Sequence, residues 1–295
     1  MIKKNILILM VFILVNCNSK IVSERKTILI RCDDIGMCHG VNLAAKRLLD
    51  TKIPFSASVM ACCPWFTDAV ELLKDQSQVS IGVHLTLNSE WKNYRWGPIS
   101  GIKSVPSLVD EQGYFFPSRS LFFENNPKTT EVELELRTQL DRAINSGLKI
   151  DYVDYHMGTA VSTSEFVEVV EKLAQEYKLG ISRWYGEKDM VGVYSILPEN
   201  KLDTLLQEIQ SLNINDINLL VCHIGSTTPE MNSMKDMNKF GLENMSRHRE
   251  SEANVLCSSE LINLIDNKIV KPITYKDLKK KIGLKNMARP KSFNY

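Results

Sequence analysis

One stretch decides the fold: Thr27-Ile28-Leu29-Ile30-Arg31-Cys32-Asp33-Asp34-Ile35-Gly36. An apolar run of β-prone residues ends there in two carboxylates, a glycine breaks the strand, and a helix-like segment follows at 41–49. A buried strand that carries acids to its C-terminal end is a common way to build a site in an α/β protein. Because side chains alternate along a strand, Asp33 and Asp34 point the same way only if the strand has already ended. One of them can then bind a metal while the other acts as a base, although an acidic pair also fits a turn or a helix start.

Strands and helices alternate about seven times along the rest of the chain. Further strands are predicted at 55–61, 79–87, 149–156, 179–184, 217–225 and 269–274. Helices are predicted at 64–74, 129–146, 164–177, 199–212 and 250–266. This alternation favours a parallel sheet with helices outside it, closed or nearly closed into a barrel, with an open doubly wound sheet as the alternative. We therefore predict an α/β fold, a single-domain TIM-barrel-like (β/α) barrel of about seven units over residues 25–280, followed by a basic tail at 281–295.

Residues 89–128 interrupt this alternation after the third strand. They are rich in Gly, Pro, Ser, Tyr and Trp and lack a clear periodicity. A long irregular stretch inside a domain is usually functional, as a lid or a binding loop, so we expect a loop insertion here. Its aromatic residues suit stacking on sugars, and packing beneath a long loop explains them at least as well: Trp91, Tyr94, Trp96, Tyr114, Phe115 and Phe116.

The N-terminus has the pattern of a secretory signal peptide. A short positive region precedes an apolar run, Asn5 to Val15, that is too short to span a bilayer comfortably. The ending at Cys17 resembles a bacterial lipoprotein cleavage box, although Asn16 stands where a small residue is usual. We expect residues 1–17 to be a signal peptide of lipoprotein type and the protein to be exported, periplasmic or anchored to the membrane only through a lipid. A plain signal peptide or an early start codon is the alternative.

The composition of the chain limits the classes of function that can be expected. Hydrophobic residues make up 44% and charged residues 24% of the chain, which is ordinary for a globular protein. The net charge of +1 gives no electrostatic reason to expect a nucleic acid as partner. No Cys-x-x-Cys pair and no glycine-rich phosphate loop are present, which argues against a zinc knuckle, a thioredoxin motif and a nucleotide site.

Three of the five histidines fall at or near the ends of apolar strands: His84, His156 and His223. Parallel strands bring their C-terminal ends to one face, so these histidines should meet Asp33 and Asp34 there. Taken singly, each histidine fits a structural role. All three at such positions, beside a double Asp, indicate a site.

Two histidines and a carboxylate form a facial metal site with open positions for water and substrate. Zinc fits such a site, as do iron, cobalt, manganese or magnesium, and we expect one divalent ion, with magnesium and zinc as the first candidates. A bound metal acidifies water, a second carboxylate accepts the proton, and a further histidine protonates a leaving group. That combination describes the hydrolysis of an unactivated carbonyl.

Six short motifs run in order across nearly all of the chain: Cys32-Asp33-Asp34-Ile35-Gly36 with Gly40-Val41-Asn42, Ile81-Gly82-Val83-His84-Leu85-Thr86-Leu87, Val153-Asp154-Tyr155-His156, Val221-Cys222-His223-Ile224-Gly225, Arg249-Glu250-Ser251-Glu252, and Ile273-Thr274-Tyr275-Lys276-Asp277-Leu278. Together they resemble the YdjC-type carbohydrate deacetylases, which are relatives in chemistry of the polysaccharide deacetylases. The resemblance implies a barrel of about seven β/α units and the removal of acetyl groups from N-acetylated sugars. The expected partner is therefore an acetylated oligosaccharide.

By matching position, the resemblance makes Asp34, His84 and His156 the metal ligands and Asp33 the catalytic base. It makes His223 an acid or an oxyanion partner.

Two positions depart from the family pattern. Met157-Gly158 stands where a second histidine is usual, and Ile224 stands where a proline is usual. The first departure bears on the substrate floor or on groups behind the ligands, and neither removes a proposed ligand. Arg249 and Trp184 are candidates for contacts with the substrate.

Two rival functions remain open. Another metal-dependent barrel hydrolase, cutting phosphodiester or cyclic amide bonds, would need more ligands, often a His-x-His pair or a bridging lysine, and the sequence has neither. A non-catalytic, surface-anchored glycan-binding protein would have no need of the metal set. The sequence does not indicate the oligomeric state.

Overall fold

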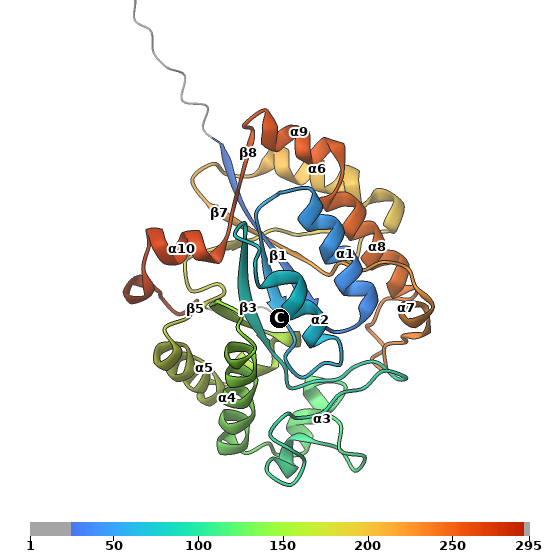
Figure 1. The fold of residues 1–295 in the computed structure, drawn as a ribbon, viewed down its shortest axis with the longest axis vertical. Helices are drawn as coiled ribbons and strands as arrows, with labels where there is room; N and C mark the ends of the chain where they lie inside the picture. Colours follow the sequence, from blue (N-terminus) through green and yellow to red (C-terminus); the bar gives the residue numbers. More distant parts are fainter. Residues whose placement is uncertain (1–24, 292–295) are drawn as a thin grey trace, which may run out of the picture.

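The computed structural model describes residues 25–291 (Figure 1). The predicted signal peptide, with Cys17, lies outside this range. Within it, no helix combines the length and the apolar character needed to cross a membrane.

A single parallel sheet forms the centre of the fold. Its strands are β1 (Lys26–Ile35), β2 (Phe55–Val59), β3 (Val79–Leu85), β4 (Ile150–Tyr155), β5 (Gly180–Ile181), β6 (Lys188–Asp189), β7 (Ile217–Cys222) and β8 (Val270–Ile273). They follow the order β5-β4-β3-β2-β1-β7-β6, and β8 pairs with the first half of β1. Each strand pairing is parallel. The predicted parallel α/β architecture is therefore confirmed.

The sheet curls like a barrel but stays open. Its two end strands, β5 and β6, follow each other in the chain, and among residues 25–291 no pairing joins them. Each is two residues long, which leaves few backbone groups for a ladder between them. The fold is thus a curled half-barrel. It agrees with the predicted barrel-like architecture, and no strand pairing closes it within residues 25–291.

Helices cover the outside of the sheet, with α1 and α8 on one side and α4 and α5 on another (Figure 1). The longer ones are α1 (His39–Asp50), α2 (Phe66–Leu73), α4 (Thr129–Asn145), α5 (Ser164–Tyr177), α6 (Lys201–Ser211), α8 (Met245–Leu256), α9 (Ser259–Asp266) and α10 (Tyr275–Lys281). In α5, Phe166, Val170 and Leu173 recur at helical spacing and are buried against the core. The predicted helix at 250–266 is two helices, because Ser258 ends the first and caps the second by accepting a hydrogen bond from the Leu261 amide.

The segment between β3 and α4 has little regular structure, only a 3₁₀ turn at Pro106–Leu108 and the short α3 (Arg119–Glu124). Trp91, Trp96 and Phe115 are buried, so these aromatic residues pack as part of the core. Buried Glu135 of α4 anchors the segment, because its carboxylate accepts hydrogen bonds from the amides of residues 99 and 100.

Candidate active site

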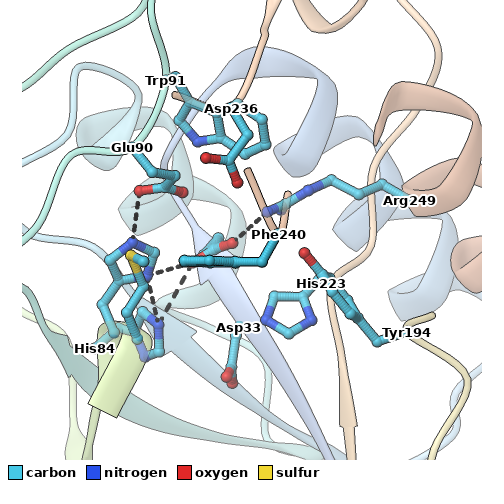
Figure 2. Close-up of a pocket in the computed structure, with 12 residues that line it drawn as sticks. Asp33, His84, Glu90, Trp91, Tyr194, His223, Asp236, Phe240 and Arg249 are labelled. Atoms are coloured by element: carbon cyan, nitrogen blue, oxygen red, sulfur yellow. Dashed lines mark hydrogen bonds and ion pairs between the residues drawn. The ribbon is translucent and has the colours of Figure 1, made fainter. Parts of the chain in front are cut away.

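The carboxyl ends of β1, β3, β4 and β7 surround a cavity of about 140 Å³ (Figure 2). It is lined by acidic, basic and aromatic side chains: Asp33, Asp34, His84, Glu90, Trp91, His156, Met157, Tyr194, His223, Asp236, Phe240 and Arg249. The five residues that the sequence places at strand ends all reach this cavity, and so does Arg249. Trp184 does not, because it turns towards α5, where its Nε1 donates to Glu171 at 3.0 Å, and it lines a separate cavity.

A bulge in β1 brings both aspartates to the cavity. The register between β1 and β2 shifts between Cys32 and Ile35, and Asp34 has a left-handed backbone with φ +64°. A bulge with a left-handed residue interrupts the alternation of side chains, so both aspartates reach the cavity although the strand continues to Ile35. Such a backbone costs an L-residue about 1–3 kcal/mol and typically persists at functional sites, where surrounding contacts enforce it.

Asp34, His84 and His156 place three ligand atoms at the corners of a small triangle. Asp34 Oδ1 lies 3.4 Å from His84 Nε2 and 3.3 Å from His156 Nδ1, and the two nitrogens are 3.3 Å apart. All three side chains are buried. Asp34 Oδ1 has no hydrogen-bond partner among the described residues.

These three distances fit ligand atoms that share one cation. Ligand atoms about 2.0–2.1 Å from one ion, at near-tetrahedral angles, are separated by roughly 3.3–3.4 Å. A buried carboxylate oxygen without a donor is costly unless a cation neutralises it. Two imidazoles and one carboxylate suit zinc or another first-row divalent metal better than magnesium.

Both histidines are held from behind by carboxylates. His84 Nδ1 lies 3.0 Å from Asp154 Oδ2, and His156 Nε2 lies 2.9 Å from Glu90 Oε2. A carboxylate on the far nitrogen fixes the tautomer and the orientation of a metal-binding imidazole. Burial lowers the pKa of His84, but Asp154 and Asp33 outweigh it and raise that pKa to about 9. A metal ion that bound here would therefore have to displace a proton from His84.

Asp33 is held by a different partner. Arg31 Nε and Nη2 each donate to one of its carboxylate oxygens at 2.7 Å, and Arg31 Nη1 donates to Ser182 at 2.7 Å. Burial raises the pKa of Asp33, but Arg31 and His84 outweigh burial and lower the pKa to about 2. Asp33 is therefore an ionised carboxylate in a fixed orientation beside the proposed ligand triangle.

Arg249 binds the second oxygen of Asp34. Its Nη2 donates to Asp34 Oδ2 at 2.7 Å. Burial raises the pKa of Asp34, but Arg249 and the two histidines outweigh burial and hold that pKa well below its ordinary value. The other two guanidinium nitrogens, Nε and Nη1, are buried without a partner among the described residues. Arg249 as a residue lines the cavity, so it stands next to the space that a substrate would enter.

His223 lies apart from the triangle, near the ring of Tyr194 at 5.1 Å between centroids. Its backbone N–H donates to Glu252 Oε2 at 2.7 Å, and Glu252 also pairs with buried Lys201 at 3.2 Å. Its Nδ1 is buried without a partner among the described residues. Burial lowers the pKa of His223, so the imidazole is neutral near neutral pH.

Sequence reasoning missed several lining or supporting residues. Asp154 could have been found, because it stands two positions before His156 at the end of β4, where alternate side chains share a face. Glu90, Asp236 and Phe240 lie in irregular segments with no periodic pattern to reveal them.

Comparison with known proteins identifies the family. The profile of the family described as YdjC-like protein matches residues 27–267. The chain belongs to the YdjC-like family. The resemblance inferred from the six motifs is thereby confirmed.

Two family relatives are similar in sequence. A protein of Enterococcus faecalis named carbohydrate deacetylase is 26% identical over 266 residues, covering 86% of this chain and 99% of the relative. A protein of Brevibacillus brevis with the same name is 31% identical over 154 residues, covering 52% of this chain and 58% of the relative. The second match therefore spans little more than half of either protein.

A solved structure has the same fold. A crystal structure from Enterococcus faecalis, provisionally described as a cellobiose-phosphate cleavage protein, superposes with a TM-score of 0.70 at 24% identity. The match covers 86% of this chain and 99% of that chain. At this identity the likeness concerns the fold, and it agrees with the family membership.

Proposed function

We propose that this YdjC-like protein is a metal-dependent carbohydrate deacetylase, a hydrolase that removes acetyl groups from N-acetylated sugars. One observation carries the proposal: the triangle of Asp34, His84 and His156 lies in the same cavity as ionised Asp33. The two relatives named carbohydrate deacetylase support the substrate class. Of the two first candidates for the metal, the imidazole pair favours zinc over magnesium.

In this proposal Asp34, His84 and His156 hold the ion, which when bound would acidify water and polarise the acetyl carbonyl. Asp33 accepts the proton of the attacking water. With a pKa of about 2 it is ionised throughout the physiological range, and the two hydrogen bonds from Arg31 keep it in one orientation.

The reaction breaks the C–N bond of the acetamide, and the oxygen of water passes to acetate while its proton reaches the departing amine. Neutral His223 can donate an N–H towards the acetyl oxygen as negative charge develops there, or relay the proton to the amine. Arg249, whose Nε and Nη1 have no partner among the described residues, is a candidate for a further contact with the substrate. Both residues line the same cavity as Asp33.

The test measures acetate release from N-acetylglucosamine oligomers together with bound metal by mass spectrometry. Asp34→Asn should lose metal and acetate release together, because it removes a ligand charge. Asp203→Asn, the same change at an exposed position of α6, is the matched control and should keep both. Metal-loaded wild-type protein that binds the oligomers but releases no acetate would instead support the glycan-binding alternative.

We also propose that the chain is exported and carries a lipid on Cys17 as its only membrane contact. The support is the signal pattern that ends at Cys17. Cys17→Ala should release the protein from the membrane fraction. Cys17→Ala protein that stays membrane-bound would argue for an uncleaved anchor.

A further inference from the structure

Lys201 is a charged side chain that the proposed reaction does not use, and it is fully buried. It is the first residue of α6, where a cation opposes the helix dipole and an acidic residue is favoured. A buried ammonium group is also costly unless it is paired and hydrogen-bonded. Because both effects are unfavourable, the contacts of Lys201 have to account for its position.

Three contacts satisfy the ammonium group of Lys201. Its Nζ donates to the carbonyl of Val193 and, at 2.8 Å, to the carbonyl of Tyr194. It also pairs with Glu252 Oε1 at 3.2 Å. Val193 and Tyr194 belong to the segment between β6 and α6, and Glu252 belongs to α8. The lysine therefore joins an irregular segment to a helix.

Glu252 extends this connection to the backbone of His223. Its side chain is 1% exposed, and its second oxygen, Oε2, accepts a hydrogen bond from the His223 amide at 2.7 Å. Arg249, three residues earlier and on the same face of α8, donates to Asp34. One face of α8 therefore contacts both Asp34 and the strand end that carries His223.

The same connection reaches the imidazole ring of His223 through Tyr194. The two ring centroids are 5.1 Å apart at an interplanar angle of 64°, and Figure 2 shows the rings side by side. His223 Nδ1 has no partner among the described residues, so no hydrogen bond within this part of the chain fixes the ring at that atom. The orientation of the ring therefore depends on its packing against Tyr194 and on the backbone hydrogen bond to Glu252.

We propose that Lys201, together with Glu252, is a positioning residue for His223. The pair fixes the backbone of Tyr194 and the end of β7, and thereby sets the direction in which the imidazole meets the substrate. Neither member of the pair lines the cavity, so neither contacts the substrate in this proposal. The inference rests on the proposed deacetylase function, in which His223 acts on the acetyl oxygen or on the departing amine.

The first test asks whether the loss caused by removing the ammonium group depends on His223. Lys201→Met should lower kcat for acetate release from N-acetylglucosamine oligomers about 10–10²-fold with little change in KM, because a misplacement of about 1 Å can cost about 10²-fold. In a His223→Ala background the same substitution should lower kcat less than about twofold, because the group that it positions is gone. An equal loss in both backgrounds overturns the inference, because Lys201 would then act on the fold as a whole.

Lys26→Met is the matched control. Lys26 Nζ also donates to main-chain carbonyls, two of them in α6, but it lies at the start of β1 and does not line the cavity. This variant should keep kcat.

A second variant guards against misfolding. Lys201→Met leaves Glu252 buried without its cation, which is destabilising. Lys201→Met combined with Glu252→Gln removes both charges and should show the same dependence on His223. A loss in this double variant that persists fully in the His223→Ala background overturns the inference as well.

Nuclear magnetic resonance of zinc-loaded protein reports on the imidazole without any turnover. The chain has five histidines, and the ring signal of His223 is the one that His223→Ala removes. Lys201→Met should shift this signal and leave those of His84 and His156 in place, whereas Lys26→Met should shift none of the three. An unshifted His223 signal overturns the inference even if acetate is released. A shifted His223 signal, together with wild-type protein that releases no acetate, upholds the positioning and overturns the deacetylase proposal.

Discussion

The floor and the rim of the cavity are built in different ways. The floor consists of strand-end residues, Asp33, Asp34, His84, His156 and His223. The rim consists of loop residues, Glu90, Trp91, Asp236 and Phe240. Floor residues stand on or next to strands with parallel neighbours, whereas two loop segments held by a few backbone hydrogen bonds carry the rim. In the proposed function, the floor carries the chemistry, which needs fixed distances, and the rim selects the substrate.

One contact links the two regions. Glu90 of the rim holds His156 of the floor at 2.9 Å, while Asp154 of β4 holds His84 at 3.0 Å. Each histidine is thus held by a carboxylate, but one carboxylate lies on a strand and the other lies in a loop. Substitutions at Glu90, Asp154 and Asp33 test whether the floor and the rim differ in this way.

The largest expected effect is on turnover, at Asp33, the proposed base. Asp33→Asn should keep the metal and lower acetate release about 10²–10⁴-fold, because the amide cannot accept the proton. Metal analysis alongside acetate release checks both parts. Full activity in this variant would refute the role of Asp33 as base and leave the floor without its proposed chemistry.

A smaller effect is expected on metal affinity, and it should differ between Asp154 and Glu90, the carboxylates that hold the two histidines. Removing such a partner typically costs about 10–100-fold in metal affinity. Asp154→Asn should cost metal affinity near the upper end of this range, because Asp154 also pairs at 3.0 Å with Arg31, the residue that holds Asp33. Glu90→Gln should cost affinity near the lower end, because the ion pair of Glu90 among the described residues is with His156 alone. Competition with a metal chelator measures both affinities. A larger loss in Glu90→Gln would contradict the division into floor and rim.

The smallest effect is a dependence of stability on pH. The folded-state pKa of Asp33 is about 2, below the ordinary value of about 3.9, so its ionised form stabilises the fold above pH 4. That contribution is lost as the pH falls from about 4 through about 2. Thermal unfolding of metal-free protein should therefore lose more Tm over this window in wild type than in Asp33→Asn. Parallel curves for the two proteins would indicate that Arg31 does not hold Asp33 as described.

The strand-end part of the site could be predicted from the sequence for a simple reason. Parallel strands bring their carboxyl ends together, so polar residues that end apolar runs converge whatever the details of packing. Asp34, His84 and His156 follow from this rule. The bulge in β1 could not be predicted from this rule. A left-handed backbone is usually signalled by a glycine, and this position is Asp34.

The rim and the far side of the sheet could not be predicted in this way. Glu90 and Phe240 come together through hydrogen bonds between loops about 150 residues apart, for which no local pattern exists. Trp184 ends a predicted strand, but β5 stops at Ile181 and a left-handed residue at Arg183 turns the chain towards α5. Short strands and loops depend on contacts distant in sequence, whereas long apolar strands do not.

Reconstitution with metal tests the central claim most directly. Protein stripped of metal with a chelator is assayed for acetate release from the β-1,4-linked disaccharide of N-acetylglucosamine, before and after addition of one equivalent of zinc. We predict no acetate release from the stripped protein and recovery that saturates near one equivalent, as one ion at Asp34, His84 and His156 requires. Unchanged acetate release from fully stripped protein would contradict the account.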